Sequence, residues 1–195
     1  LNGSNRLAFG YDDLGRLTSR SYASTTGSTV RKTTYTYVAG ANGSTTNLLA
    51  TVNNAGFSGL TYTYDSMGNI KTIKEGSKTE TYTYDSLGQL TRVDSQKENK
   101  SYTYSYDNRG NITSKKEYAY TTGPLGTVTK PINYAYGDAT WKDLLTSYNG
   151  QSITYDTIGN PLSYRGMTLT WANGRQLSTL TKSGKTTSYE YDING

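Results

Sequence analysis

Acidic side chains recur along the chain and are the residues that could do chemistry. Each follows an aromatic residue, as at Tyr84-Asp85, and in most copies a Gly lies three positions further on. Paired carboxylates can hydrolyse a glycosidic bond. The chain has no His and no Cys, which excludes Ser-His-Asp and Cys-His catalysis and imidazole or thiolate metal ligands. The recurrent acids are Asp12, Asp65, Asp85, Asp107, Asp156 and Asp192.

The spacing of these acids argues against catalysis. A catalytic acid is normally unique, whereas Asp65, Asp85 and Asp107 are 20 and 22 residues apart and occupy the same place in a repeated motif. Asp12 and Asp13 are no acid pair, because adjacent strand residues point to opposite faces. No calcium-loop or phosphate-loop spacing occurs. We therefore interpret the acids as turn formers and predict no enzyme activity, no cofactor and no metal site.

The repeated motif reads Tyr-Asp-x-x-Gly-x-Leu/Ile, with Trp in place of Tyr in one copy and a truncated copy at the end of the chain. A period near twenty residues indicates a repeat array. We predict a structural role for its recurring residues. They are Tyr11, Asp12, Gly15 and Leu17; Tyr64, Asp65, Gly68 and Ile70; Tyr84, Asp85, Gly88 and Leu90; Tyr106, Asp107, Gly110 and Ile112; Tyr155, Asp156, Gly159 and Leu162; Trp171, Gly174 and Leu177; Tyr191 and Asp192.

Each copy predicts the tip of a β-hairpin. Thr and Tyr alternate up to Tyr84, which favours a strand with the Tyr rings on one face. Asp85 can end the strand by accepting hydrogen bonds from the backbone two or three residues on. Gly88 supplies the positive φ of a bulged turn, and Leu90 begins the return strand.

A second set of turns joins the copies. Asn149-Gly150 favours a type I′ turn, and we place further reversals at Glu75-Gly76 and Ser183-Gly184. Thr140–Leu145 could form one helical turn. The copies are degenerate near 23–60 and 119–150. The fold class that follows is all-β, a meander of antiparallel hairpins.

Composition limits the other possibilities. Of the 195 residues 33% are hydrophobic, but 20 are Tyr, which predicts an ordered sheet with a thin aromatic core rather than disorder. The net charge of +5 is spread along the chain, which indicates a solvated surface rather than a nucleic-acid site. No apolar run is long enough for a membrane span.

The Tyr rings have two interpretations: cross-strand packing, which their periodicity favours, or sugar stacking in a glycan-binding or adhesion module.

These motifs resemble the RHS/YD repeat family, whose consensus is close to Tyr-Asp-x-x-Gly-Arg-Leu. Tyr11–Leu17 fits it fully, and in other copies the Arg becomes Asn69, Gln89, Asn111 or Asn160. The resemblance covers essentially the whole chain, so we expect one repeat array over 1–195. Leu1-Asn2-Gly3 begins just ahead of a copy and Asn194-Gly195 ends inside one, so we expect a fragment of a longer chain.

The resemblance implies a long, curved sheet that spirals into a hollow shell. In bacterial members of the family the shell encloses a C-terminal toxin domain. It therefore implies a non-enzymatic wall segment of a secreted or cell-surface bacterial protein, whose partners are the rest of its own chain. The family's autoproteolytic Asp-Pro site is absent, since no Asp-Pro occurs. Open sheet edges also predict self-association.

Overall fold

The computed structural model describes residues 6–23 and 29–193. It divides into two compact units, residues 1–101 with 119–125 and residues 102–118 with 126–195. Every regular element among the described residues is a strand, apart from one short 3₁₀ turn, η1 (Ala41–Gly43). The predicted all-β fold class is thereby confirmed.

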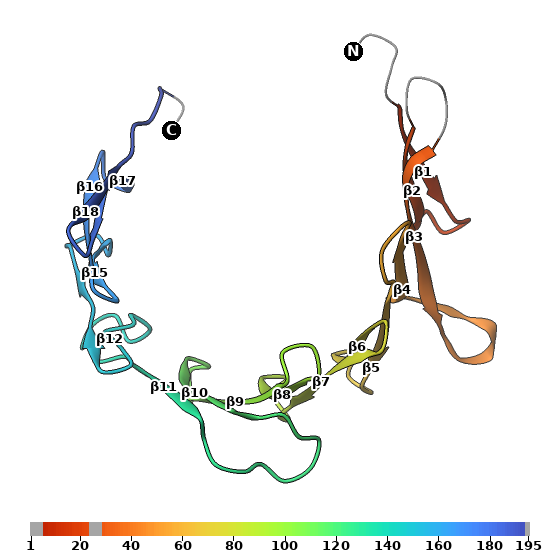
Figure 1. Ribbon diagram of the computed structural model, residues 1–195, viewed down its shortest axis with the longest axis horizontal. Helices are drawn as coiled ribbons and strands as arrows, with labels where there is room; N and C mark the ends of the chain where they lie inside the picture. The colour runs from red at the N-terminus through yellow and green to blue at the C-terminus, as the bar shows by residue number, and fades with distance from the viewer. Residues whose placement is uncertain (1–5, 24–28, 194–195) are drawn as a thin grey trace. The chain divides into compact units, whose positions relative to one another are not determined.

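In the first unit the strands form an antiparallel meander in which each strand lies beside the next in sequence (Figure 1). Its strands are β1 (Arg6–Tyr11), β2 (Leu17–Ala23), β3 (Thr29–Ala39), β4 (Thr45–Asn54), β5 (Leu60–Tyr64), β6 (Ile70–Glu75), β7 (Lys78–Tyr84) and β8 (Leu90–Ser95).

The second unit continues the same pattern. Strand β9 (Lys100–Tyr106) has residues in both units, and the order β9 to β13 again follows the sequence, as does that of a separate sheet, β14 to β18. The strands are β10 (Ile112–Ala119), β11 (Lys130–Ala135), β12 (Ser147–Tyr148), β13 (Gln151–Ser152), β14 (Thr154–Tyr155), β15 (Pro161–Tyr164), β16 (Met167–Ala172), β17 (Gln176–Lys182) and β18 (Lys185–Ser188).

The strands form because Tyr and Thr alternate along them. In β5 the rings of Tyr62 and Tyr64 are half-buried, whereas the intervening Thr63 is exposed. On the exposed face the hydroxyls of Thr63 and Thr72 lie 2.6 Å apart, and those of Thr170 and Thr179 lie 2.7 Å apart. Each hairpin therefore has a tyrosine face and a threonine face, as a period of two requires.

The bulged hairpins are confirmed. In β7 and β8, Thr83 pairs with Arg92 but Tyr84 pairs with Leu90, so Thr91 is the extra residue of a β-bulge. The same shift precedes Tyr11, Tyr64, Tyr155 and Trp171. Gly88 has φ of 76°, a conformation that a residue with a Cβ adopts only at a cost.

The connecting turns are mostly as predicted. Asn149 and Gly150 both have positive φ, as do Ser183 and Gly184, which is the signature of type I′. The reversal after β6 lies one residue later than expected, because Glu75 pairs with Lys78 and leaves Gly76-Ser77 as the turn.

Two other predictions concern the residues 140–145 and the degenerate stretches of the chain. The helical turn predicted at Thr140–Leu145 is wrong: a single reverse turn stands there, closed by the Leu144 amide donating to the Trp141 carbonyl at 3.0 Å. Within the stretches predicted to be degenerate, η1 stands where an Asp-x-x-Gly turn would be and residues 121–129 carry no strand. Asn194-Gly195 and Leu1-Asn2-Gly3 lie outside the described residues.

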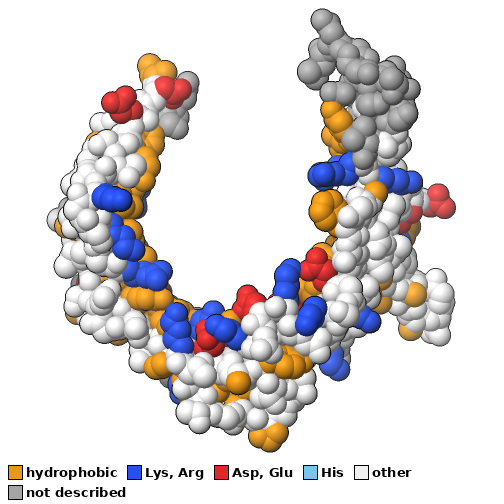
Figure 2. Space-filling view, in the orientation of Figure 1, with side chains coloured by type: hydrophobic (Ala, Val, Ile, Leu, Met, Phe, Trp, Pro, Cys, Tyr) orange, Lys and Arg blue, Asp and Glu red, His pale blue; other side chains and the backbone are white. Residues whose placement is uncertain are grey.

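The buried core is thin. Among the described residues the hydrophobic side chains that are buried are Val93, Tyr102, Tyr118 and Ile153. Figure 2 shows hydrophobic side chains reaching the surface of both units, with basic and acidic groups between them. Stability must therefore come from contacts between neighbouring hairpins more than from a deep apolar centre.

The turn geometry makes Gly88 harder to replace than a loop glycine. We expect Gly88→Ala to lower the free energy of unfolding by about 1–2 kcal/mol, because Ala must adopt a left-handed conformation. Gly126 is the matched control, since its φ is not positive and a Cβ there would meet nothing within 4 Å. Urea unfolding of both variants measures the difference. Equal losses would contradict the assignment of the cost to φ.

Candidate functional site

The repeat motif is the candidate functional site, and its centre is the Asp carboxylate. In the copy at Tyr84 the Oδ1 atom of Asp85 accepts the amides of Leu87 and Gln89, both at 2.9 Å. The Asp85 carbonyl accepts the Gly88 amide at 3.1 Å. The prediction of a turn-forming Asp is thus right, but the side-chain bonds reach two and four residues on. The same pair of Oδ1 bonds forms at Asp12, Asp65, Asp107 and Asp156.

In four copies the residue after Gly binds the second carboxylate oxygen. The Nδ2 atom of Asn69 donates to Oδ2 of Asp65 at 3.0 Å, and Asn111 does the same for Asp107. In the first copy the Arg16 guanidinium forms a 2.7 Å ion pair with Asp12. Asn and Arg are therefore interchangeable here because each brings an N–H donor to the same oxygen.

At Arg16 and Asn160 this sixth motif residue also reaches the following copy. Arg16 lies over the Tyr37 ring, 4.2 Å from its centroid, and donates to the Thr45 hydroxyl at 2.6 Å and to the Thr46 carbonyl. Asn160 donates to the Gly174 carbonyl at 2.6 Å. Sequence reasoning missed this role; the recurrence of Arg and Asn at one position was the signal that could have found it.

The motif Tyr is the second link between copies. The Tyr84 hydroxyl donates to the Ile70 carbonyl at 2.9 Å, and Ile70 is the Leu/Ile position of the preceding copy. The Tyr64 hydroxyl donates to the Leu49 carbonyl, and the Tyr191 hydroxyl to the Leu177 carbonyl. We call these bonds the hydroxyl ladder. A residue type that the sequence assigned to packing therefore also satisfies a backbone acceptor in its neighbour.

The degenerate copies keep the ladder although they lose the turn. The Tyr37 hydroxyl donates to the Leu17 carbonyl at 2.9 Å, and the Tyr136 hydroxyl to the Ile112 carbonyl at 3.0 Å. The Leu145 carbonyl, which lies outside any intact motif, accepts the Tyr155 hydroxyl at 2.6 Å. The stretches 23–60 and 119–150 are thus copies in which the donor was retained and the turn was replaced.

One predicted motif residue is misplaced. Tyr155 pairs with Pro161, the register position that Leu90 holds opposite Tyr84, so Pro161 and not Leu162 is the return-strand residue of this copy. Leu162 is 38% exposed. The Pro161 carbonyl accepts the Trp171 Nε1–H at 2.8 Å, so indole replaces phenol in the ladder. A Pro can serve because the position needs only its carbonyl.

The remaining predicted residues lie at the expected places. Gly15, Gly68, Gly110, Gly159 and Gly174 all have positive φ. Tyr106 ends β9 ahead of the Asp107 turn. Tyr11 ends β1 and is 61% exposed, while Asp192 lies beyond the last strand. Its turn would need Gly195, which lies outside the described residues.

The fourth motif position is apolar and exposed in four copies, whereas the copy at Tyr106 has Arg109 there. Leu87 is 81% exposed, and Leu14 and Met67 are each 66% exposed. Ile158 is also exposed. These side chains lie largely in water beside the turn, so they bury little apolar area within the hairpin.

The electrostatics of the carboxylates follow their hydrogen bonds. The side-chain bond from Arg16 holds the pKa of Asp12 below its ordinary value, and the bonds from Asn69 and Asn111 do the same for the pKa of Asp65 and Asp107. At Asp156 desolvation opposes the shift, yet the Asn160 bonds still leave the pKa lowered. Stabilised carboxylates of this kind are poor proton donors near neutral pH.

Burial acts on the tyrosines in the opposite direction. Desolvation raises the pKa of Tyr64, Tyr84, Tyr136 and Tyr155 above the ordinary phenol value. The neutral phenol is therefore favoured, which is the form that can donate to a carbonyl.

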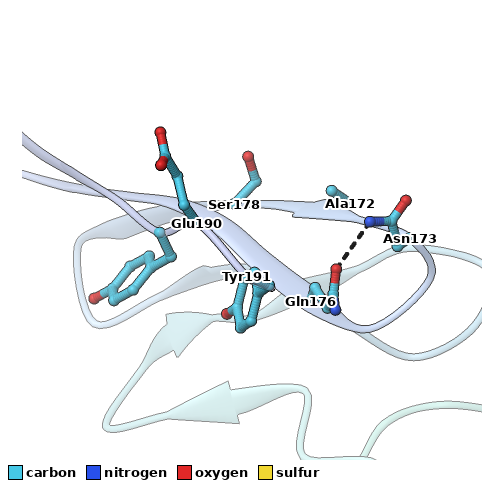
Figure 3. Close-up of a pocket in the computed structure, with 7 residues that line it drawn as sticks. Ala172, Asn173, Gln176, Ser178, Glu190 and Tyr191 are labelled. Carbon is cyan, nitrogen blue, oxygen red and sulfur yellow. Dashed lines mark hydrogen bonds between the residues drawn. The ribbon is translucent and has the colours of Figure 1, made fainter. Parts of the chain in front are cut away.

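Outside the repeat motif, depressions also lie in the surface of the described residues. No three acids among these residues group together in a way that could hold a metal ion, and no described helix is long and apolar enough to cross a bilayer. A depression of about 330 Å³ lies beside β17 and the segment that follows β18 (Figure 3). It contains one carboxylate, Glu190, and an amide pair in which Asn173 donates to Gln176 at 2.9 Å.

The fold and the ladder define a repeat protein of hairpins tied to one another, and comparison with known proteins agrees. Residues 38–131 match the teneurin YD-shell family. No curated protein matches the sequence. These findings confirm the predicted resemblance to the RHS/YD repeat family.

Solved structures show the same fold. The chain is similar to the TcdB2-TccC3-TEV and TcdB2-TccC3-Cdc42 crystal structures, each with 19% identity over 98% of this chain, at TM-scores of 0.57 and 0.54. A TcdB2-TccC3 structure without the hypervariable C-terminal region matches with 19% identity over 92% of this chain, at a TM-score of 0.51. The chain spans only 11–12% of the length of these proteins.

The hydroxyl ladder predicts a difference between two tyrosines on one strand. Tyr64→Phe leaves the Leu49 carbonyl without its donor and should lower the free energy of unfolding by about 0.5–1.5 kcal/mol. Tyr62→Phe removes a hydroxyl that donates to no carbonyl among the described residues, and should cost clearly less. Urea unfolding of both variants tests this. Equal costs would show that the hydroxyl bond does not stabilise the fold.

The turn carboxylates predict a loss of stability in acid. The pKa of Asp65 and of Asp107 is lower in the folded state than the unfolded value near 3.9. Their contribution is therefore present above about pH 4 and is lost as pH falls through the folded pKa. The urea midpoint should drop between about pH 7 and about pH 3, and Asp65→Asn with Asp107→Asn should drop less. An identical drop in the double variant would refute the assignment.

Proposed function

We propose that this chain is a non-enzymatic segment of a β-shell wall, and that in the complete protein the shell encloses a C-terminal toxin domain. The observation that carries the proposal is the hydroxyl ladder, which ties neighbouring copies together, as from Tyr84 to Ile70 and from Tyr64 to Leu49. A ladder of this kind propagates along a wall of any length, because each unit presents the acceptor for the next.

The carboxylates support a structural role. A general acid must release a proton from an available oxygen, but each regular turn commits its Asp to several hydrogen bonds. Asp156 accepts the Ile158 and Asn160 amides on Oδ1 and the Asn160 side chain on Oδ2. Since the two Oδ1 bonds recur from copy to copy, the arrangement supports a turn-forming role for these carboxylates rather than a catalytic one.

The exposed tips support a larger assembly. Leu14, Met67 and Leu87 place apolar side chains in water at the tips of three hairpins. Exposed apolar groups that gather into one patch commonly mark a surface that another structure covers. In a complete shell, other parts of the wall or its contents would cover them.

The neighbouring proteins support the toxin part of the proposal. The structures similar to this chain are named for toxin-complex components, and one of them is described as lacking a hypervariable C-terminal region. By analogy, we propose a secreted or cell-surface bacterial protein whose partners are the other segments of its own chain. Self-association through sheet edges stays a prediction.

The ladder argues against a glycan-binding or adhesion module that uses the motif aromatics. Trp171, for example, is half-buried and donates its Nε1–H to the Pro161 carbonyl. The indole is therefore engaged within the fold rather than presented for stacking on a sugar.

Protease protection tests the enclosure. In the complete protein that contains these repeats, the domain that follows them should resist a protease, whereas the same domain produced alone should be cut rapidly. A combined Tyr64→Phe and Tyr84→Phe variant, which loosens the wall, should shorten the protected lifetime, and Tyr62→Phe should not. Equal cleavage of the free and the shell-linked domain would refute enclosure.

A further inference from the structure

A second depression lies in the 102–118 and 126–195 unit, between the segment after β11 and the turn between β14 and β15. Its volume is about 510 Å³, enough for one or two sugar rings. The residues that matter among those lining it are Asp138, Thr140, Trp141, Tyr155, Asp156 and Thr157. None of these belongs to the hydroxyl ladder except Tyr155.

Trp141 is exposed yet held in place. The indole is 51% exposed. Its backbone amide donates to Asp138 Oδ1 at 2.6 Å, and the Thr140 amide donates to the same oxygen at 2.9 Å. Since the Trp141 carbonyl also accepts the Leu144 amide, the turn fixes the main chain from both sides. An exposed indole fixed in this way forms a ready aromatic platform.

The ring rests on the neighbouring motif turn. A Cβ built on Gly159 would lie 2.6 Å from the Trp141 Cζ3 atom and 2.9 Å from Cη2, so the indole lies directly against this glycine. The φ of Gly159, 86°, is what favours glycine at this position. The contact joins the indole to the Asp156 turn, which brings a carboxylate-bearing loop to the edge of the platform.

The polar side chains that line this depression suit a ligand with hydroxyl groups better than an anionic ligand. The lining holds two carboxylates, Asp138 and Asp156, and the Thr140 and Thr157 hydroxyls, but no Lys or Arg. Asp138 uses Oδ1 for the turn, and its Oδ2 accepts no bond from any described group, so this oxygen can accept from a ligand hydroxyl. Negative charge beside an aromatic face disfavours phosphates and carboxylates.

We propose that this depression binds a neutral hexopyranose, with one face of the sugar stacked on Trp141 and its hydroxyls donating to Asp138. Stacking supplies contact area without a charge, and the carboxylate orients the ring. The site is independent of the wall function, since neither Trp141 nor Asp138 contributes to the hydroxyl ladder.

Calorimetric titration of the purified protein with methyl glycosides of glucose, galactose and mannose, and with N-acetylglucosamine, tests the proposal. We expect saturable binding of at least one sugar, weakened about tenfold by Trp141→Ala. Asp138→Asn retains the turn acceptor and should weaken binding to a smaller extent. Phe57→Ala, which removes another exposed ring in the other unit, should bind as the unaltered protein does.

Three outcomes would overturn the proposal: no saturable binding of any of these sugars, equal binding by Trp141→Ala, or tighter binding of adenosine, which would show a general aromatic platform. Circular dichroism of each variant separates loss of the site from loss of the fold. If Trp141→Ala unfolds, Trp141→Phe keeps a smaller ring and should bind more weakly than the unaltered protein.

Discussion

The rest of this structure depends on the hydrogen bond from an aromatic side chain to a backbone carbonyl in the preceding hairpin. A hairpin alone is marginally stable in water, because it buries little apolar surface. Here the Tyr84 ring covers its neighbour while its hydroxyl satisfies the Ile70 carbonyl. One side chain thereby supplies both the apolar contact and the polar partner that joining two hairpins requires.

This bond explains why a sheet can exist with so small a core. Val93, Tyr102, Tyr118 and Ile153 are the buried hydrophobic residues in the described part of the chain. In a repeat protein each unit is stabilised by its neighbours, so stability grows with the number of interfaces rather than with the depth of one centre. Tyrosine suits such interfaces, because its ring can be half-buried while its hydroxyl stays bonded.

The Asp turn and the hydroxyl ladder are independent features of a copy, because the turn can be lost while the ladder bond is kept. At residues 40–44 the turn is replaced by η1, yet the Tyr37 hydroxyl still reaches the Leu17 carbonyl. At Trp171 the donor changes from phenol to indole and the acceptor residue is Pro161, yet the bond persists at 2.8 Å. What must recur is therefore an aromatic side chain that can donate a hydrogen bond and a backbone carbonyl in the preceding hairpin that can accept it. The Tyr-Asp-x-x-Gly-x-Leu/Ile sequence is one way to place these two groups, and the degenerate copies place them with other residues.

The sequence by itself determined the local structure. Alternating Thr and Tyr set the strands, Asp85 and Gly88 set the bulged turn, and Asn149-Gly150 set a type I′ turn, because each depends on the preferences of a few adjacent residues. Only the tertiary structure decided what crosses between hairpins. The Tyr64 bond to Leu49, the double role of Arg16 and the choice of Pro161 over Leu162 depend on register and on distances between segments many residues apart. Local propensities carry no information about those distances, so they could be learned only from the folded chain.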